Sequence, residues 1–175
     1  MAVLDVLTVP HPVLAREARP VHDDEFGSDL EKRLTDMAET MYAAPGVGLA
    51  GPQVGDSRRI IVVDSGEGEQ RGQRLMKMVN PEIVERSQEP ITWSETCLSV
   101  PDFEVDVDRS RRVEVTWRTP DGAPHREWFE DYEAVIVQHE LDHLAGVVLL
   151  DKVSAFRRSR YLKRRRKAAK QRSAG

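Results

Sequence analysis

The segment DYEAVIVQHELDHLAG (Asp131–Gly146) decides the fold, because it combines a helical apolar pattern with a chemically specific motif. Its apolar residues recur at three- and four-residue intervals, which predicts an amphipathic helix; they are Ala134, Val137, Leu141 and Leu144. Gly146 follows the last of them and is expected to end the helix, as glycine commonly does.

Inside this helix the residues His139-Glu140-Leu141-Asp142-His143 form an H-E-x-x-H motif. Side chains four residues apart on a helix are offset by only about 40°, so His139 and His143 project from one face and are placed to hold one divalent ion. Glu140 lies beside them, where its carboxylate can accept a proton from an activated water. The alternative is a solvated helix face that carries two histidines, and the strong helical pattern favours the metal site.

Two histidines leave a catalytic metal site short of a third protein ligand. The residues after His143 include no histidine and no glutamate, and Asp151 is the only acidic one. A metalloprotease is therefore disfavoured, because its third ligand follows the motif. Cys97, the single cysteine, is the softest donor upstream; its alternative role is that of an inert buried thiol. A Cys-His-His set favours Zn²⁺ or Fe²⁺ over hard cations.

The rest of the chain predicts helices at both ends and short strands between them. Ser28–Ala44 has helical periodicity, with Ser28 as the expected N-cap, and Arg58–Asp64 is an apolar strand. From 75 to 129 the pattern is strand-like and alternating, and a basic helix capped by Ser154 follows the central one. We predict an α+β fold, with short, mostly antiparallel strands around the H-E-x-x-H helix.

Composition and charge limit the classes of protein. The chain has 175 residues, 39% of them hydrophobic, and no apolar run long enough to span a membrane. The first twenty residues have no basic segment ahead of an apolar one, and there is a single cysteine, so we expect a cytoplasmic protein. From Lys152 onward there are eleven Lys and Arg and no Asp or Glu. This basic tail on an acidic body indicates an anionic partner such as nucleic acid.

Three segments resemble the signature segments of the peptide deformylase family, in the same order: GVGLAGPQVG (Gly46–Gly55), ETCLSVP (Glu95–Pro101) and QHELDHLAG (Gln138–Gly146). The similarity extends from VLTVPHPVL to LLDKVS. It implies a metal-dependent hydrolase that removes the formyl group from the N-terminal formyl-methionine of nascent polypeptides and releases formate.

The resemblance also implies roles for individual residues. Cys97, His139 and His143 match the ligands of one divalent ion, Fe²⁺ in the cell with Zn²⁺, Ni²⁺ or Co²⁺ as substitutes. Glu140 matches the general acid and base. The side-chain amide of Gln53 and the backbone N–H of Leu98 match the donors to the formyl oxygen, although Gln53 taken alone fits an amide that satisfies a turn.

Further positions match the substrate pocket, and each of them fits an ordinary core or surface residue equally well. By resemblance the pocket is lined by Val47, Gly48, Trp93, Thr96, Tyr132, Val135 and Ile136. Glu95 and Arg109 match positions that pair to brace the cysteine loop.

The main departure from the family pattern is Thr96, which replaces the glycine of E-G-C-L-S. If this position required a positive φ, a β-branched residue would cost about 1–2 kcal/mol or change the path of the loop. We therefore expect slower or altered peptide handling with the metal retained. Pro45 and Glu104 also differ from some relatives, which changes the charge at the mouth of the cleft.

The resemblance divides the chain into a deformylase domain, residues 1–153, and a basic helix or tail, residues 154–175, that is either part of that domain or appended. The tail resembles a helix that some relatives dock on the ribosome, although a solvated helix fits equally well. Two alternatives remain: a paralogue with altered substrate range, inhibitor tolerance or low activity, and a non-catalytic, metal-stabilised ribosome-associated protein. Glu140 and Gln53 argue against the latter, because a structural metal site needs neither.

Overall fold

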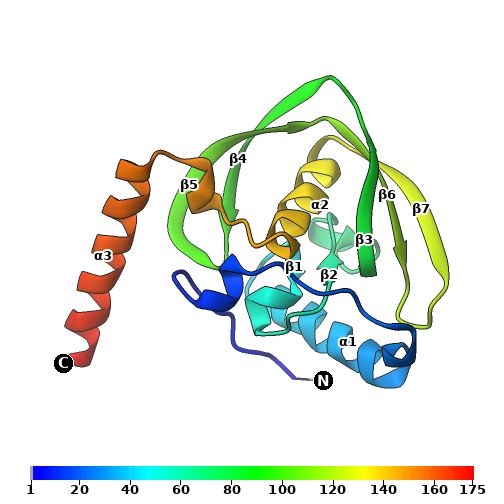
Figure 1. The fold of residues 1–175 in the computed structure, drawn as a ribbon, viewed down its shortest axis with the longest axis horizontal. Helices are drawn as coiled ribbons and strands as arrows, with labels where there is room; N and C mark the ends of the chain where they lie inside the picture. Colours follow the sequence, from blue (N-terminus) through cyan, green and yellow to red (C-terminus); the bar gives the residue numbers. More distant parts are fainter. Residues whose placement is uncertain (1) are drawn as a thin grey trace.

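Helix α2 (Asp131–Leu144) lies at the centre of the molecule in the computed structural model, which describes residues 2–175 (Figure 1). Four consecutive residues, Ala134 to Val137, are buried, so the helix is covered on more than one side. Gly146 adopts φ +73°, the left-handed conformation that ends many helices. The prediction of a central helix that ends at this glycine is confirmed.

Two antiparallel sheets surround this helix. The five-stranded sheet has the order β1-β2-β3-β6-β7 and the other pairs β4 with β5. The strands are β1 (Gly48–Ala50), β2 (Ile60–Val63), β3 (Met76–Arg86), β4 (Pro90–Cys97), β5 (Val100–Ser110), β6 (Arg112–Arg118) and β7 (Pro124–Glu130). Helix α2 contacts strands of both sheets. The predicted α+β class is confirmed.

Helix α1 (Ser28–Ala43) packs its apolar face on the five-stranded sheet. Its periodic residues are fully buried together with two residues of β2, namely Leu30, Leu34, Met37, Met41, Ile60 and Val62. This packing fixes the far end of α1 next to the segment that enters β1.

The predicted N-cap of α1 is wrong by one residue. Gly27 is the N-cap and Ser28 is the first helical residue. Gly27 has φ +127°, a conformation that favours glycine, and its N–H donates to the carbonyl of Pro120 at 3.0 Å. This long-range contact sets where the chain turns into the helix, and local sequence gave no sign of it.

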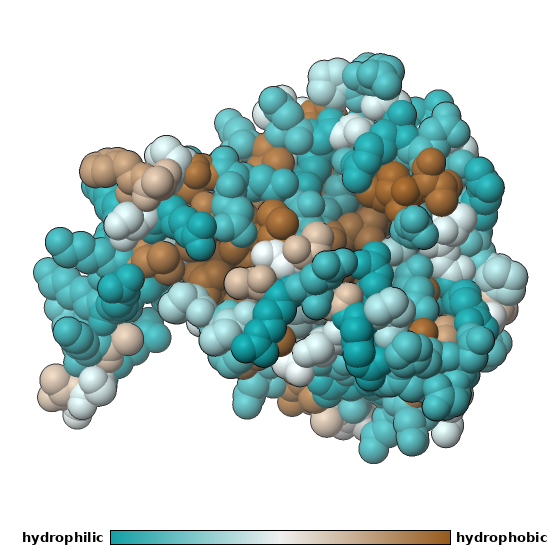
Figure 2. All heavy atoms as spheres, in the orientation of Figure 1, coloured by the Kyte–Doolittle hydropathy of each residue, from teal (hydrophilic) through white to brown (hydrophobic). Residues whose placement is uncertain are grey.

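Helix α3 (Ala155–Ser173) begins against β5 and then extends away from the body (Figure 1). The hydroxyl of Ser154 accepts from the N–H of Arg157 at 3.3 Å, which confirms the predicted cap. Tyr161 is buried, its ring meets Phe103 edge-on at 5.3 Å, and its hydroxyl donates to the carbonyl of Pro101 at 2.6 Å. Figure 2 shows a mainly hydrophilic surface over the rest of this helix. None of the helices in residues 2–175 is both long and apolar enough to cross a membrane.

Candidate active site

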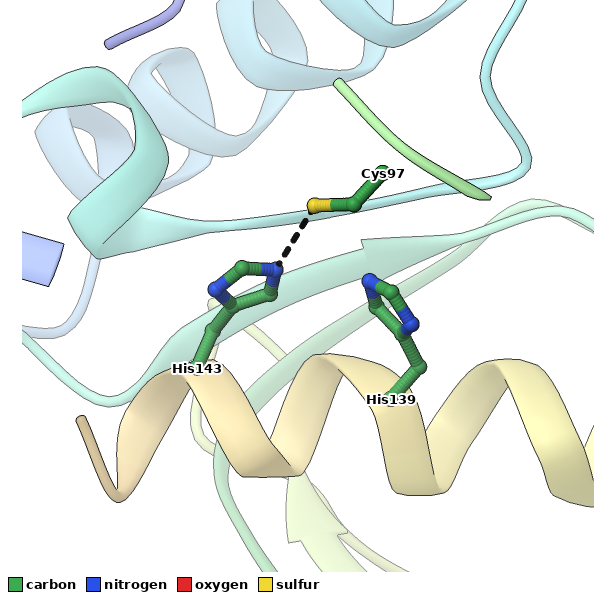
Figure 3. A group of neighbouring side chains, drawn as sticks. All are labelled: Cys97, His139 and His143. Atoms are coloured by element: carbon green, nitrogen blue, oxygen red, sulfur yellow. Dashed lines mark hydrogen bonds between the residues drawn. The ribbon is translucent and has the colours of Figure 1, made fainter. Parts of the chain in front are cut away.

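Three potential metal ligands meet between α2 and the end of β4. His139 and His143 point from one face of α2 toward Cys97, the last residue of β4 (Figure 3). Their ligand atoms all lie within 4.8 Å of one another, and Cys97 Sγ is 3.4 Å from His143 Nε2. A single ion can therefore be shared by all three. The spacing of the histidines and the lack of a suitable donor after His143 predicted this arrangement.

A buried ion pair fixes the orientation of one imidazole. Glu95 accepts two hydrogen bonds of 2.9 Å from the guanidinium of Arg109 and lies 2.8 Å from His139 Nδ1. Arg109 also donates to Asp142 at 2.7 Å. Because Nδ1 of His139 is engaged by a carboxylate, its Nε2 is the nitrogen left to bind a metal. The predicted pairing of Glu95 with Arg109 is present, and Asp142 is a member of this network that the sequence did not indicate.

The two histidines differ in electrostatics. Burial lowers the pKa of His143 well below its usual value, and repulsion from His139 and Arg109 adds to the effect. Burial also acts to lower the pKa of His139, but its interactions with Cys97 and Glu95 outweigh burial and raise it. His143 is thus held neutral, the form in which an imidazole nitrogen keeps a free lone pair.

The residues present fit a divalent ion with an open coordination position. Thiolate and imidazole donors suit Zn²⁺ and Fe²⁺, and three protein ligands are typical of a catalytic site. Glu140 is 4% exposed, and its Oε2 has no hydrogen-bond partner within the described part of the chain. Burial raises the pKa of Glu140 to about 7. A carboxylate with such a pKa is suited to accept and return a proton near neutral pH.

A cavity of about 440 Å³ opens beside this cluster. Its walls come from the segment before β1, from β4 and the turn after it, and from α2. The rings of Trp93 and Tyr132 stack at 4.8 Å. All seven residues predicted for the substrate pocket line this cavity: Val47, Gly48, Trp93, Thr96, Tyr132, Val135 and Ile136. The sequence did not indicate the lining residues Ser94 and Asp102; Asp102 takes φ +57°, which no local pattern signals.

Gln53 and Leu98 also line the cavity. The Oε1 of Gln53 accepts from the N–H of Ala50 at 2.9 Å, so this amide does satisfy a turn. Its Nε2 lies 3.1 Å from Ser99 Oγ and 3.7 Å from Cys97 Sγ. One end of the amide is therefore fixed by the backbone while the other faces the ligand cluster.

The condition for strain at Thr96 is not met, because this residue has no positive φ. Thr96 lies within β4, opposite Glu104 of β5, in extended backbone that β-branched residues favour. Among residues 2–175, positive φ values outside glycine occur at Asn80, Asp102 and Asp131. The side chain of Thr96 is exposed to the cavity, so any effect on peptide handling comes from its size and hydroxyl group.

A sequence model of the polypeptide deformylase family matches residues 3–159. The chain belongs to this family. It is 42% identical over 167 residues to the peptide deformylase of Desulfotalea psychrophila, covering 95% of this chain and 97% of the relative. It is 43% identical over 169 residues to that of Hyphomonas neptunium, covering 96% and 94%. The predictions of a deformylase and of an enzyme are confirmed.

Solved deformylase structures have the same fold. The structure of a peptide deformylase from Legionella pneumophila has a TM-score of 0.88 and 33% identity over 99% of both chains. A class I type b peptide deformylase from Acinetobacter baumannii, described with Met-Ala-Ser bound, has a TM-score of 0.81 and 38% identity over 87% of this chain and 99% of that one. The Legionella match therefore includes nearly all of α3.

Proposed function

We propose that this deformylase hydrolyses the formyl group from N-formyl-methionyl peptides and releases formate. The observation that carries the proposal is the convergence of Cys97, His139 and His143 within 4.8 Å, at the side of a cavity that also contains Glu140. Metal ligands, a proton carrier and a substrate-sized space thus meet at one place, as hydrolysis of an amide by an activated water requires.

The ligand cluster is proposed to hold one divalent ion, Fe²⁺ in the cell, with Zn²⁺, Ni²⁺ or Co²⁺ as substitutes. When bound, such an ion would polarise the formyl oxygen. It would also lower the pKa of water enough for the water to lose a proton at neutral pH and attack. The donors of Cys97 and the two histidines favour these ions over Mg²⁺ or Ca²⁺, which prefer oxygen ligands.

The chain's own residues supply proton transfer and charge stabilisation. Glu140 accepts the proton of the attacking water on its free carboxylate oxygen and then delivers it to the leaving amine. The Nε2 of Gln53 and the backbone N–H of Leu98 are the proposed donors to the formyl oxygen as negative charge develops on it. Because the other end of the Gln53 amide is bonded to Ala50, this donor is oriented before substrate arrives.

The cavity suits a methionine side chain followed by an extended peptide. Trp93, Tyr132, Val135 and Ile136 supply apolar and aromatic surface for the methionine. Strand β1 is at the edge of the five-stranded sheet, so a peptide is able to add to it as a further strand. The structurally similar Acinetobacter deformylase with Met-Ala-Ser bound supports this class of ligand, since that tripeptide is the product expected from formyl-Met-Ala-Ser.

We also propose that residues 154–175 are an appended basic helix that binds the phosphate backbone of ribosomal RNA, while residues 1–153 form the catalytic domain of a cytoplasmic enzyme. Eleven basic residues from Lys152 onward gain affinity by releasing counterions at phosphates. Deleting residues 165–175, which lie beyond the Tyr161 anchor and carry five of these eleven basic residues, is expected to weaken salt-sensitive ribosome binding and to leave formate release intact. Unchanged binding would reject docking in favour of a solvated helix.

Formate release from formyl-Met-Ala-Ser, by protein purified anaerobically and assayed for metal content, tests the proposed function. Glu140→Gln is expected to lower kcat by about 10²–10⁴-fold, since it removes the acid and base but keeps the side-chain shape. Glu133→Gln is the control, because Glu133 lies on the same helix but bonds Ser65 and Arg74. A metal-loaded wild type that releases no formate would reject the proposal and favour the non-catalytic alternative.

A further inference from the structure

The loop between β2 and β3 reaches back to the wall of the cavity through Arg71. Its Nη2 donates to the carbonyl oxygen of Gly46, a residue that lines the cavity. The same guanidinium lies over the ring of Tyr42, 4.9 Å from the centroid. Arg71 therefore joins α1, the β2–β3 loop and the cavity wall.

The wall segment Pro45–Gly48 is fixed by bonds to three different parts of the chain. The N–H of Gly46 donates to Met41 at the end of α1, and the carbonyl of Val47 accepts from the N–H of Asp64 after β2, each at 2.9 Å. The third bond is the one from Arg71, which comes from a side chain. Leu98, another cavity-lining residue, lies close to this wall, since a Cβ added to Gly46 would be 3.1 Å from its Cδ1.

The loop that carries Arg71 is itself fixed by Asp64. Its carboxylate accepts from the N–H groups of Gly66 at 2.9 Å and Gly72 at 2.6 Å. It also accepts from the hydroxyl of Tyr42 at 2.7 Å. Arg71 is thus held in two ways. Asp64 fixes the loop on either side of it, at Gly66 and Gly72, and the ring of Tyr42 stacks on its guanidinium.

We infer that Arg71 is a positioning residue for the peptide substrate, an inference that rests on the proposed function. By holding the Gly46 carbonyl it fixes the segment Pro45–Gly48, along which the peptide extends beyond the formyl-methionine. It touches none of the proposed reacting groups. Its effect is expected on peptide binding, because within the described residues Arg71 makes no hydrogen bond to Glu140, Gln53 or Leu98. Gly48, which packs on Glu140, is held separately by its pairing with Val63 of β2.

The contact needs arginine in particular. A guanidinium is planar, so it is able to stack on an aromatic ring while an edge N–H donates to a carbonyl. A lysine ammonium keeps the charge but lacks the planar edge. Lysine at this position is therefore expected to restore only part of the function.

The kinetic experiment compares Arg71→Met, Arg71→Lys and the control Arg74→Met. Arg74 belongs to the same loop but pairs with Glu127 and Glu133, away from the wall. Arg71→Met is expected to raise KM for formyl-Met-Ala-Ser roughly tenfold and to change kcat less than about twofold, as loss of one charged hydrogen bond that serves binding predicts. The rise in KM should be smaller for formyl-methionine alone and intermediate for Arg71→Lys. Equal KM values for Arg71→Met and Arg74→Met would overturn the inference.

Hydrogen exchange separates this inference from the proposed function. Exchange at the amide of Gly46 is expected to become about tenfold faster in Arg71→Met and to stay unchanged in Arg74→Met, because local opening governs exchange of a bonded amide. Unchanged protection in Arg71→Met would reject the role of Arg71 whatever the activity. Absence of formate release by the wild type, with the protection lost as expected, would reject the proposed function instead.

Discussion

At the scale of single residues, the site depends on close contacts that leave no room for added atoms. A Cβ on Gly48 would lie 2.3 Å from Glu140 Oε1 and 2.8 Å from its Cγ. Glycine is therefore required here by the carboxylate of α2 packed against it. The contact also explains how Glu140 is kept in place although its Oε2 has no hydrogen-bond partner in the described chain.

Replacing Gly48 with alanine should displace Glu140 from its position in the cavity. We expect kcat/KM to fall about 100-fold, the loss associated with a misplacement of about 1 Å at a catalytic group. Metal content should be unchanged, because the three atoms nearest to the new methyl group all belong to Glu140, which is not a proposed ligand. Gly175→Ala is the control, since the nearest atom its Cβ would meet is the carbonyl oxygen of Gln171 at 3.9 Å. Full activity of Gly48→Ala would show that Glu140 needs no such fixation.

A second prediction concerns the buried charge of Glu95. Glu95→Gln would leave the guanidinium of Arg109 without its buried partner and His139 without its carboxylate. We expect a loss of about 3–5 kcal/mol in the free energy of unfolding, measured in urea. Metal affinity should also fall about 10–100-fold, measured by competition with a chelator. Glu89→Gln, which breaks an exposed pair with Arg111, should change neither quantity appreciably.

The cluster of proposed metal ligands was predictable from sequence because helix geometry places His139 and His143 together and the lack of later donors points to Cys97. The conformation of Thr96 was not, since it follows from pairing with Glu104 across a turn. The left-handed conformation at Asp102, within β5, likewise depends on how this strand continues from the turn after β4. The chemistry of these residues could therefore be predicted from the sequence around them. The backbone conformation at the site could not, because it depends on how the strands pair.

At the scale of elements, periodicity predicted the helices better than it predicted how the strands group. Apolar spacing identified α1 and α2 because each buries a continuous face. The separation of β4 and β5 into their own sheet could not be predicted, since alternation along a strand does not name its partner. That separation is what opens the cavity between β1 and β4.

The contact between α1 and the β2–β3 loop gives a prediction for alkaline pH. Burial, with the hydrogen bond to Asp64, raises the pKa of Tyr42 to about 12. Because the folded pKa lies above the unfolded value of about 10, the stability that Tyr42 contributes is complete below pH 10 and is lost as pH rises toward 12. Absorbance of tyrosinate should show a transition near pH 12 that Tyr42→Phe removes. A transition near pH 10 for this tyrosine would contradict the buried hydrogen bond.

At the scale of the whole molecule, the charge of the chain is divided between an acidic body and a basic helix. Helix α3 extends away from the body (Figure 1), and the hydrogen bond from the hydroxyl of Tyr161 to the carbonyl of Pro101 joins it to β5. Pro101, which accepts the hydrogen bond of Tyr161, also lines the cavity. Pro101 is therefore part of both the attachment of α3 and the wall of the cavity.

Substitutions of Tyr161 weaken the attachment of α3 to the body and leave the basic residues of the helix unchanged. Tyr161→Phe removes one hydrogen bond and should cost about 1 kcal/mol in the free energy of unfolding. Tyr161→Ala also removes the ring packed on Phe103 and should cost about 3 kcal/mol or more. With the ring gone, trypsin should cleave between 157 and 167 much faster, while the metal content of the body stays the same.

For the proposed ribosome binding, the same two variants distinguish recognition of the charge of α3 from recognition of its orientation. The basic residues are intact in Tyr161→Ala, so affinity that depends on charge alone should persist with the same dependence on salt. Affinity that depends on the direction in which the helix leaves the body should fall with Tyr161→Ala and remain with Tyr161→Phe. The second outcome is expected, because a helix anchored beside Pro101 presents its charge at a fixed angle to the cavity. Equal ribosome binding by both variants would show that α3 acts as a flexible basic tail whose orientation does not matter.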